Sequence, residues 1–404
     1  MDDKDVQPLI ERMDYLVNRV SIDFHRYLFE EIKWENRLIG IKGGRGTGKT
    51  TLLRQHVRES FGGVGEKVLY VSLDDLWFSR NSLIDLADWH RKRGGTHMFI
   101  DEVHYLKPWQ TYIKNLTDFF PDLSVGYTGS SMLKIDYGGA DISRRQIVYD
   151  LNGLSFREYL AFEGIKNIAP LGVDEILRSH REVAREITHG VSILKHFHDY
   201  LSSGYYPFYR EDRESFHVRL QSVVNQVLEV DLPTIEEVSP ATVFKAKKML
   251  AILADSVPQT PKMAVLYREL ETDRNQGLKI LKALARSGLL GLLSTEKVSL
   301  KDMSRPDKIY LDNTNLISAL SGRDANVGTV REVFAVNQLS QAHQVEYKKK
   351  NGDFFVDGRW TLEIGGADKG FGQIANIQDS YVLADDIETP NGAKIPLWLL
   401  GFLY

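Results

Sequence analysis

Apolar residues recur at helical spacing near the start of the chain, at Leu9, Met13, Leu16 and Val17. A short apolar run at 37–42 then leads directly into a group of glycines, and we expect a strand there. Strand, glycine loop and helix, in this order, form the arrangement that a phosphate-binding site requires. The N-terminal pattern therefore predicts a helical start followed by a phosphate-binding loop.

Further apolar strands are expected at 68–73, 98–100, 123–128 and 146–151, with helical or loop segments between them. Strands that alternate with helices build a largely parallel sheet, because each crossover returns the chain to the same end of the sheet. The pattern therefore predicts an α/β core that ends near residue 150.

The pattern becomes helical from 155 to about 240, with one break at 203–207, where the sequence reads SGYYP. We interpret this segment as a small helical lid. Three more helical patterns follow, at 243–253, 263–270 and 274–286, and a strand is expected after the third. A short turn between the second and third helices and a strand after the third predict a winged helix-turn-helix.

The last hundred residues change pattern again. A helix is expected around 330–339, followed by strands that are interrupted by two strong hairpin signals, Asn351-Gly352 and Asp357-Gly358. The final ten residues, 395–404, are almost entirely apolar, and we interpret them as a buried terminal strand. This segment predicts a separate small α+β unit.

Composition narrows the class of protein. The chain has 404 residues and no cysteine, which excludes disulfide bonds and thiolate metal sites. The acidic N-terminus does not resemble a secretory signal, and the run at 395–404 is about half of what a membrane-spanning helix needs. We expect a cytoplasmic protein with no membrane segment. The net charge is −4, but residues 241–301 hold eleven Lys and Arg against five Asp and Glu, so nucleic-acid contact is expected there first.

The sequence GGRGTGKT at 43–50 matches the phosphate-loop motif G-x-x-x-x-G-K-[ST] in full. Backbone N–H groups of such a loop cradle phosphate oxygens, Lys49 adds positive charge at the β and γ phosphates, and the Thr50 hydroxyl is a ligand for Mg²⁺. A plain glycine turn is the alternative. We expect ATP or ADP to be bound by Gly43, Gly44, Arg45, Gly46, Thr47, Gly48, Lys49, Thr50 and Thr51.

The short apolar strand that ends at residue 100 is followed by two carboxylates, Asp101 and Glu102. We expect Asp101, with Thr50, to hold Mg²⁺ through its water shell, and Glu102 to orient and deprotonate the attacking water. Acidic residues that only cap the next helix are the alternative. Together with Lys49, these residues predict an ATPase that uses ATP and Mg²⁺.

Two further positions are candidates for sensing phosphate. Thr128 ends the next expected strand, where a polar side chain would lie at the edge of the sheet near the γ-phosphate. Arg144 and Arg145 precede the strand at 146–151, and an arginine supplied to a phosphate site speeds hydrolysis by roughly 10³- to 10⁵-fold. A strand-to-turn role for Thr128 and a surface role for the two arginines remain open.

Five motifs together resemble the prokaryotic AAA-type ATPases of the archaeal-ATPase-like group. They are GRGTGKT at 44–50, DEVHYL at 101–106, TGSS at 128–131, LSFREYL at 154–160 and YLSSGYYP at 200–207. The resemblance spans the chain and implies a P-loop AAA+ core at 1–152, a lid at 153–238, a winged helix at 239–305 and a restriction-endonuclease-like domain at 306–404. It also places Arg145 where that family has an arginine, for action in its own subunit or on a neighbour in a homo-oligomer.

The third helix of the expected winged helix carries residues of the types that contact DNA bases and phosphates. The same fold also serves as a rigid packing module, so DNA contact and a protein-protein role both remain open. The candidate DNA contacts are Arg274, Asn275, Gln276 and Lys279.

The resemblance to restriction endonucleases points to Glu332, Asp353 and Glu363, the order in which such folds gather Mg²⁺ between carboxylates. The position two after Glu363 should be a lysine and is Gly365, so we expect a domain without catalysis. Lys369 is the residue that would have to reach back from the following loop to replace it.

Three hypotheses follow for the whole chain. The one that we favour is an ATP-hydrolysing switch that couples nucleotide state to the binding of DNA or a protein. The second is a scaffold or regulator that holds ATP with negligible turnover. The third is an ATP-regulated DNA nuclease, which the glycine at 365 disfavours.

Overall fold

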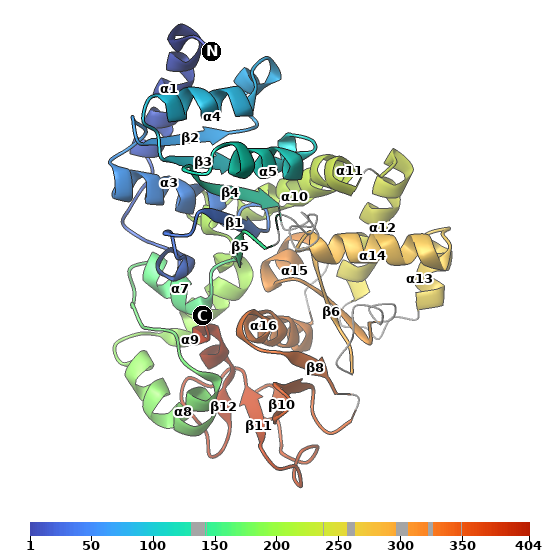
Figure 1. Ribbon diagram of the computed structural model, residues 1–404. Helices are drawn as coiled ribbons and strands as arrows, with labels where there is room; N and C mark the ends of the chain where they lie inside the picture. The colour runs from blue at the N-terminus through green and yellow to red at the C-terminus, as the bar shows by residue number, and fades with distance from the viewer. Residues whose placement is uncertain are drawn as a thin grey trace. The chain divides into compact units, whose positions relative to one another are not determined.

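The computed structural model describes residues 1–130, 142, 144–236, 238–256, 263–295, 306–321, 326–348 and 350–404. Ser131, the last residue of the TGSS motif, lies outside this part of the chain. The chain divides into two units, Met1–Asn152 and Gly153–Tyr404 (Figure 1). Within the described residues, no helix is both long enough and apolar enough to cross a bilayer.

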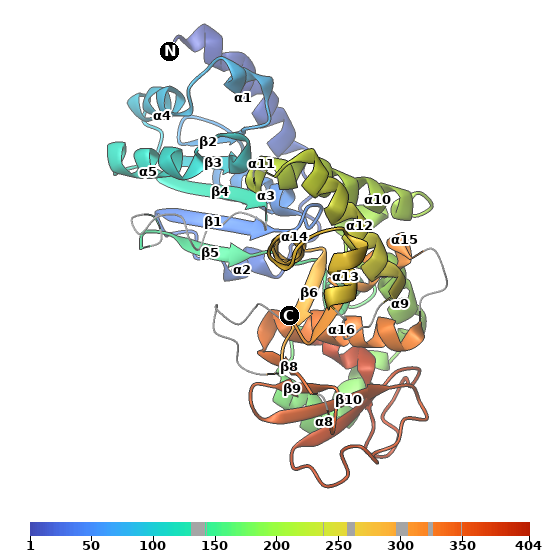
Figure 2. The same ribbon diagram turned by 90° about the vertical axis from the view of Figure 1, so that its right-hand side faces the viewer.

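The N-terminal unit is built on a five-stranded sheet in which every neighbouring pair is parallel. Its order is β2-β3-β4-β1-β5, and Figure 2 shows the strands stacked in that order. The α/β class with a parallel sheet, as predicted from the alternating pattern, is confirmed. The strands are β1 (Leu38–Gly43), β2 (Val68–Ser72), β3 (His97–Asp101), β4 (Ser124–Ser130) and β5 (Ile147–Asp150).

Helices pack on this sheet through regularly spaced apolar residues. In α1 (Asp3–Asn18) the buried residues are Val6, Leu9, Met13 and Val17, which share one face because they recur every three or four positions. This helix packs on α3 and β2. The other helices among the described residues of this unit are α2 (Leu28–Glu31), α3 (Lys49–Phe61), α4 (Leu83–Lys92) and α5 (Trp109–Phe119), with short 3₁₀ helices η1 (Leu76–Ser79) and η2 (Val103–Tyr105).

The second unit begins with a group of helices. Ser155 caps the first of them, because its side chain accepts from the backbone N–H of Glu158 and the Glu158 side chain accepts from the N–H of Ser155. The helices are α7 (Phe156–Phe162), α8 (Val173–Thr188), α9 (Ile193–Asp199), η4 (Tyr200–Gly204), η5 (Pro207–Arg210), α10 (Phe216–Gln226), η6 (Val227–Asp231) and α11 (Leu232–Glu236).

Three helices and a two-stranded hairpin follow. The helices are α12 (Pro240–Ser256), α13 (Met263–Glu269) and α14 (Arg274–Arg286). Strand β6 (Leu290–Leu293) then pairs antiparallel with β7 (Lys308–Leu311). Because β7 begins after residue 305, this hairpin joins residues from both sides of the predicted boundary between 239–305 and 306–404.

The C-terminal part of this unit is a second sheet, in the order β12-β11-β10-β9-β8. Strands β8 to β10 are antiparallel, and β10 to β12 are parallel. Asp357 and Gly358 have φ values of 51° and 67° at the β9–β10 turn, as expected for a tight hairpin. The elements are α15 (Thr314–Leu320), α16 (Val327–Ala342), β8 (Val345–Tyr347), β9 (Phe354–Val356), β10 (Trp360–Gly365), β11 (Ser380–Ala384) and β12 (Ile395–Pro396).

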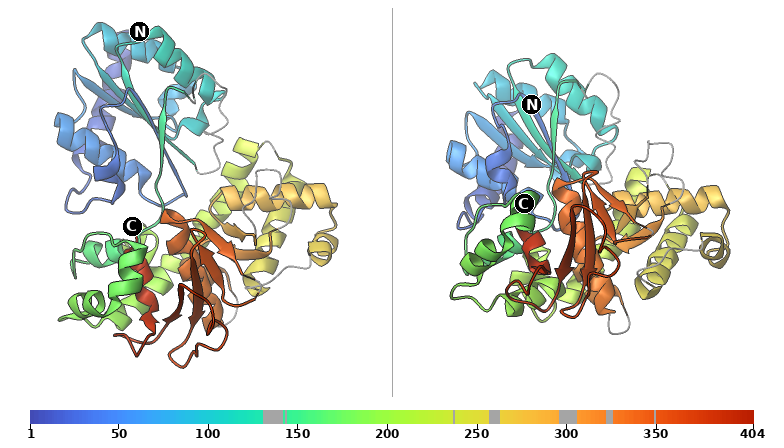
Figure 3. Two further views of the ribbon diagram at one scale, coloured as in Figure 1. Left: turned by 60° about the horizontal axis from the view of Figure 1, so that its bottom comes forward. Right: turned by 90° about the horizontal axis from the view of Figure 1, so that it is seen from below.

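The apolar C-terminus is buried, but the prediction of a terminal strand is wrong. Only Ile395–Pro396 is strand, and Leu397–Phe402 forms the 3₁₀ helix η7, which packs against α7, α8 and α16 (Figure 3). An unbroken apolar run has no periodicity that separates a buried strand from a buried helix. The backbone oxygen of Tyr404 is held by Ser155 Oγ at 2.8 Å and Arg157 Nε at 2.9 Å.

Candidate functional site

The predicted phosphate loop connects the end of β1 to the start of α3. Gly46 and Gly48 have φ values of 83° and 100°, which favour glycine because a side chain would clash with the backbone. A Cβ on Gly43 would lie 2.3 Å from the backbone oxygen of Leu151. The sequence therefore forms this loop because glycine stands at each of these positions. Thr51 is exposed on the first turn of α3.

Lys49 is buried, and its ammonium lies inside the loop. Its Nζ donates to the backbone oxygens of Gly43 and Gly44, at 3.0 and 2.9 Å. Thr47 Oγ1 also donates to Gly44 O, at 2.9 Å. The loop therefore surrounds a positive charge, as the motif predicts.

Arg26 supports the loop from a segment that the motif does not include. Its guanidinium donates to the backbone oxygens of Thr47, at 2.5 Å, and Asn152, at 2.8 Å. Arg26 is buried, so these bonds fix the back of the loop to the end of the N-terminal unit. Sequence reasoning missed this residue, because nothing in its local sequence marks it as a partner of the loop.

Asp101 is at the end of β3, almost fully buried, and surrounded by hydroxyl groups. Thr50 Oγ1 and the Tyr70 hydroxyl donate to its Oδ2 at 2.7 and 3.0 Å, and Thr128 Oγ1 donates to its Oδ1. Burial raises the pKa of Asp101, the charge of Glu102 adds to this, and the three hydroxyl donors oppose it. The structure therefore brings three of the predicted residues, Thr50, Asp101 and Thr128, into one network.

Glu102 follows directly in a left-handed backbone conformation, with φ 54° and ψ 50°. Its N–H donates to Thr128 Oγ1 at 3.0 Å, and its Oε2 lies 3.1 Å from Nδ1 of the buried His104. Burial alone would raise the pKa of Glu102, but the interaction with His104 and the positive charges of Lys49 and Arg45 outweigh it and lower the pKa to about 2. Glu102 is thus an ionised carboxylate beside the loop. His104 belongs to the DEVHYL motif at 101–106, but the sequence did not predict its contact with Glu102.

Arg145 lies away from the loop of its own subunit. In the parallel pairing of β1 and β5, Ile39 faces Ile147, whereas the loop leaves the opposite end of β1 after Gly43. Arg145 comes just before Ile147 and forms an ion pair with Asp118. Arg145 therefore lies near the end of the sheet opposite to the loop, separated from it by the length of β1, and its role at a phosphate site stays a prediction.

The candidate DNA-contact residues lie on the first two turns of α14. Arg274, Asn275 and Lys279 are exposed. Gln276 is half-buried, and its side-chain oxygen accepts from Thr272 Oγ1 at 2.8 Å. Three of the four candidates are therefore on one accessible helix end.

Some of the basic side chains in residues 241–301 form hydrogen bonds within the protein. Lys245 and Lys248 of α12 donate to the backbone oxygens of Glu271 and Glu269, at 2.7 and 2.6 Å. These lysines cap the end of α13, where helix carbonyls lack partners. These two lysines are already engaged within the protein, so only part of the excess of Lys and Arg over Asp and Glu in this segment can contact DNA.

The three nuclease-like carboxylates also lie in one region, but lysines neutralise two of them. Lys308 forms an ion pair with Glu332, and Lys369 forms one with the buried Glu363. Lys369 comes from the loop after β10, and its stem fills the space that a Cβ on Gly365 would occupy, 2.5 Å away.

Asp353 is the third of these carboxylates. Its Oδ2 accepts from the N–H of Ile364 at 2.8 Å. Burial, together with the charges of Glu363 and Glu332, raises the pKa of Asp353 to about 6, although the Ile364 hydrogen bond opposes this. The N–H of Asp353 also donates to the backbone oxygen of Leu362 at 2.8 Å, so Asp353 lies beside the strand that carries Glu363.

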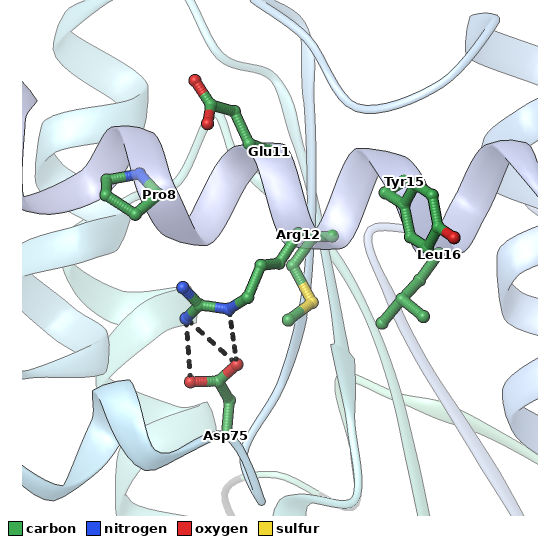
Figure 4. Close-up of a pocket in the computed structure, with 7 residues that line it drawn as sticks. Pro8, Glu11, Arg12, Tyr15, Leu16 and Asp75 are labelled. Carbon is green, nitrogen blue, oxygen red and sulfur yellow. Dashed lines mark hydrogen bonds and ion pairs between the residues drawn. The ribbon is translucent and has the colours of Figure 1, made fainter.

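Two other features lie outside the predicted sites. His198, Asp385 and Asp386 bring one ligand atom each within 4.8 Å, but Arg331 already binds both carboxylates, at 2.8 and 2.9 Å. A pocket of about 530 Å³ lies along α1, where Arg12 forms an ion pair with Asp75 at 3.0 Å (Figure 4). Neither contains a residue of the phosphate loop or the acidic pair.

Comparison with known proteins assigns part of the chain. Residues 35–160 match a family described as AAA domain, and residues 194–327 match a domain of unknown function, DUF8612. The uncharacterized protein MJ1637 of Methanocaldococcus jannaschii is 26% identical over 292 residues, which are 69% of this chain and 60% of that protein. The residues that match the AAA domain include the whole phosphate loop and the acidic pair Asp101 and Glu102.

Solved structures give only weak similarity. DnaA of Aquifex aeolicus bound to AMPPCP has a TM-score of 0.26 and 16% identity, covering 68% of this chain and 88% of DnaA. Domain III of DnaA from Thermotoga maritima scores 0.25 with 18% identity, covering 47% and 89%. PCH-2 of C. elegans scores 0.23 with 18% identity, covering 46% and 60%. Scores this low support no conclusion about fold or function.

Proposed function

We propose that this chain binds ATP with Mg²⁺ and hydrolyses it at the site formed by residues 43–50, Asp101 and Glu102. One observation carries the proposal: Thr50, Asp101 and Thr128 share a buried hydrogen-bond network next to a glycine loop that surrounds Lys49. A hydroxyl and a carboxylate beside an ammonium are the groups that a metal-bound triphosphate needs.

The loop binds the phosphates. Its backbone N–H groups and the start of α3 attract negative charge, because the N-terminus of a helix carries a partial positive charge. Lys49 exchanges the backbone oxygens of Gly43 and Gly44 for phosphate oxygens when nucleotide enters. Arg26 keeps the loop backbone in place during this exchange.

Thr50 and Asp101 are the residues that hold Mg²⁺. Their oxygens lie 2.7 Å apart, and hydroxyl and carboxylate oxygens are the hard ligands that Mg²⁺ prefers. The ion supplies charge neutralisation at the β and γ phosphates. The hydroxyls around Asp101 keep both carboxylate oxygens oriented toward this position.

Glu102 orients the attacking water. A pKa of about 2 keeps Glu102 ionised at neutral pH, but a base this weak abstracts a proton poorly until nucleotide charge raises its pKa. Orientation is therefore its first role. His104, whose Nδ1 lies 3.1 Å from Glu102 Oε2, helps to position this carboxylate.

The rest of the chain responds to nucleotide in this proposal. Residues 153–238 act as a lid, and α12–α14 with the β6–β7 hairpin act as a winged helix that contacts DNA or a protein partner. Arg145 acts on the nucleotide of a neighbouring copy, because it is exposed and remote from its own loop. An ATP-bound scaffold with negligible turnover is the alternative for the same site.

A nuclease function has one observation in its favour, the Lys369–Glu363 ion pair. Incubation of plasmid with Mg²⁺ or Mn²⁺, for the wild type and for Glu363→Ala, tests it. We expect no cleavage by either protein, because lysines already neutralise two of the three carboxylates. Cleavage that is lost in Glu363→Ala would establish the nuclease.

Phosphate release tests the proposed ATPase. We expect Mg²⁺-dependent release in the wild type and a loss of roughly 10²- to 10⁴-fold in Glu102→Gln, the range for removal of a group that acts on the reacting water. Glu59→Gln removes a carboxylate from the same unit and serves as the control. Full turnover in Glu102→Gln would exclude this mechanism, and negligible turnover with tight binding would favour the scaffold.

A further inference from the structure

Tyr70 is a buried tyrosine of β2, and its hydroxyl reaches the acidic pair from the strand beside β3. It donates to Asp101 Oδ2 at 3.0 Å, and the residue has no exposed surface. No motif includes Tyr70, and the proposed mechanism does not use it. Its hydroxyl contacts Asp101, the carboxylate proposed to hold Mg²⁺, so its role is not limited to packing.

Arg54 fixes the orientation of this hydroxyl. Its Nε donates to the Tyr70 oxygen at 2.9 Å, and its guanidinium lies 5.3 Å from the centre of the ring. Because Arg54 occupies an acceptor position of the phenol oxygen, the hydroxyl hydrogen is directed to Asp101. Arg54 is on α3, the helix that begins with Lys49 and Thr50, so the contact joins the phosphate loop's helix to β2 and β3.

We propose that Tyr70 is a positioning residue for Asp101, and that Arg54 acts through it. This inference rests on the proposed ATPase site. Thr50 also donates to Oδ2, but it is itself a proposed ligand of Mg²⁺. Tyr70 and Thr128 are then the contacts that orient the two carboxylate oxygens independently of the metal ligands.

A purely structural role makes a different prediction. In that case, removing any buried tyrosine hydroxyl of the sheet would have a similar effect. Tyr127 of β4 provides this comparison, because it is equally buried and its hydroxyl donates to Gln146 at 2.5 Å, not to the acidic pair. Tyr70→Phe and Tyr127→Phe each remove one hydroxyl from the same sheet.

The experiment measures binding of a fluorescent, non-hydrolysable ATP analogue to the full chain over a range of Mg²⁺ concentrations. We expect Tyr70→Phe to raise the half-saturating Mg²⁺ concentration by roughly 10- to 100-fold, the usual cost of removing a group that orients a metal ligand. Binding without Mg²⁺ should not change. Tyr127→Phe should behave as the wild type in both conditions.

A Mg²⁺ dependence in Tyr70→Phe equal to that of the wild type, or a matching shift in Tyr127→Phe, would overturn the proposal. If Tyr70→Phe does not fold, Arg54→Lys tests the same proposal, because this substitution removes the Nε donor to Tyr70 and keeps the positive charge. We expect a smaller shift in the same direction, and no shift would overturn the proposal. A wild type that binds no analogue would instead refute the ATPase site itself.

Discussion

Each unit holds a group of carboxylates with one buried member, Asp101 in the N-terminal unit and Glu363 in the C-terminal unit, but the two groups are held in different ways. Asp101 accepts hydrogen bonds from three hydroxyl groups. Glu332 and Glu363 are each bound by an ammonium group. Hydroxyl donors orient a carboxylate and leave its charge in place, whereas an ammonium group cancels that charge.

Under the proposed function, the N-terminal carboxylates would bind an added cation, whereas Glu332 and Glu363 already have lysine ammonium groups as partners. The lysine of the N-terminal site, Lys49, binds backbone oxygens of the loop, so phosphate can replace them at little cost. The lysines of the C-terminal group bind the carboxylates directly. The same residue types therefore predict ATP chemistry in one unit and a stable charge cluster in the other.

The largest expected effect comes from removing one carboxylate charge from each unit in turn. Asp101→Asn should reduce Mg²⁺-dependent phosphate release by roughly 10³-fold, since a metal that neutralises phosphate charge contributes several kcal/mol to the transition state. Glu363→Gln should leave release unchanged. Phosphate release by both variants at saturating ATP checks this, and equal losses would abolish the contrast.

One residue from each unit should also change the stability in opposite directions as the pH falls, and the residue from the N-terminal unit is His56 of α3. Burial, with a contribution from His97, lowers the pKa of His56 to about 4, and its ring stacks on Trp34 at 3.6 Å. In the unfolded chain His56 binds a proton below its usual pKa near 6.5, whereas in the folded chain it stays neutral down to about pH 4. The contribution of His56 to folding stability is therefore present above about pH 6.5 and is lost as the pH falls toward 4.

A shift of this size corresponds to about 3 kcal/mol. We expect the stability difference between the wild type and His56→Gln to change by up to that amount between pH 7 and pH 4. Urea unfolding of both proteins across this range measures it. A difference that does not depend on pH would show that His56 is not held neutral.

Asp353 should respond in the opposite direction. Its folded pKa of about 6 is raised above the unfolded value near 4, so its contribution to stability is complete below about pH 4 and is lost as pH rises through about 6. Asp353→Asn should therefore be more stable than the wild type by about 1 to 3 kcal/mol at pH 8, with no gain at pH 4. Urea unfolding at the two pH values checks this, and a gain at both would contradict it.

The smallest expected effects are on DNA binding, and they distinguish exposed basic side chains from a basic side chain that is bound to the protein's own backbone. Arg274 and Lys279 are exposed on α14, whereas Lys245 caps α13. If the winged helix binds DNA, the logarithm of the binding constant should fall with the logarithm of the salt concentration. Arg274→Ala and Lys279→Ala should each make this slope shallower by about one, the contribution of one phosphate contact, and Lys245→Ala should leave the slope unchanged. Titrations of duplex DNA at several salt concentrations measure this. Equal effects of all three would remove α14 as the contact.

The elements of the core could be predicted because they depend on local pattern. The apolar runs gave the five strands of the N-terminal unit, and the fixed spacing of the loop motif gave Lys49 and Thr50. Asp101 followed from its place at the end of a strand, since parallel strands end at one edge of the sheet. These features need no knowledge of distant residues.

Other features depend on contacts between distant segments and carry no local signal. Tyr70 and Arg26 are ordinary strand and loop residues until the fold brings them to Asp101 and Thr47. The pairing of β7 with β6 spans the boundary predicted at 305, because strand partners are chosen in three dimensions. The place of Arg145 near the end of the sheet opposite to the loop also has no local sequence signal.

Calorimetric titration of ATP into the full chain, with and without Mg²⁺, tests the central claim most directly. The account predicts binding by the wild type that Mg²⁺ strengthens, loss of binding in Lys49→Ala, and wild-type binding in Lys67→Ala, which removes an exposed lysine of the same unit. Binding that survives in Lys49→Ala, or that is absent in the wild type, would contradict the claim that this loop holds a triphosphate.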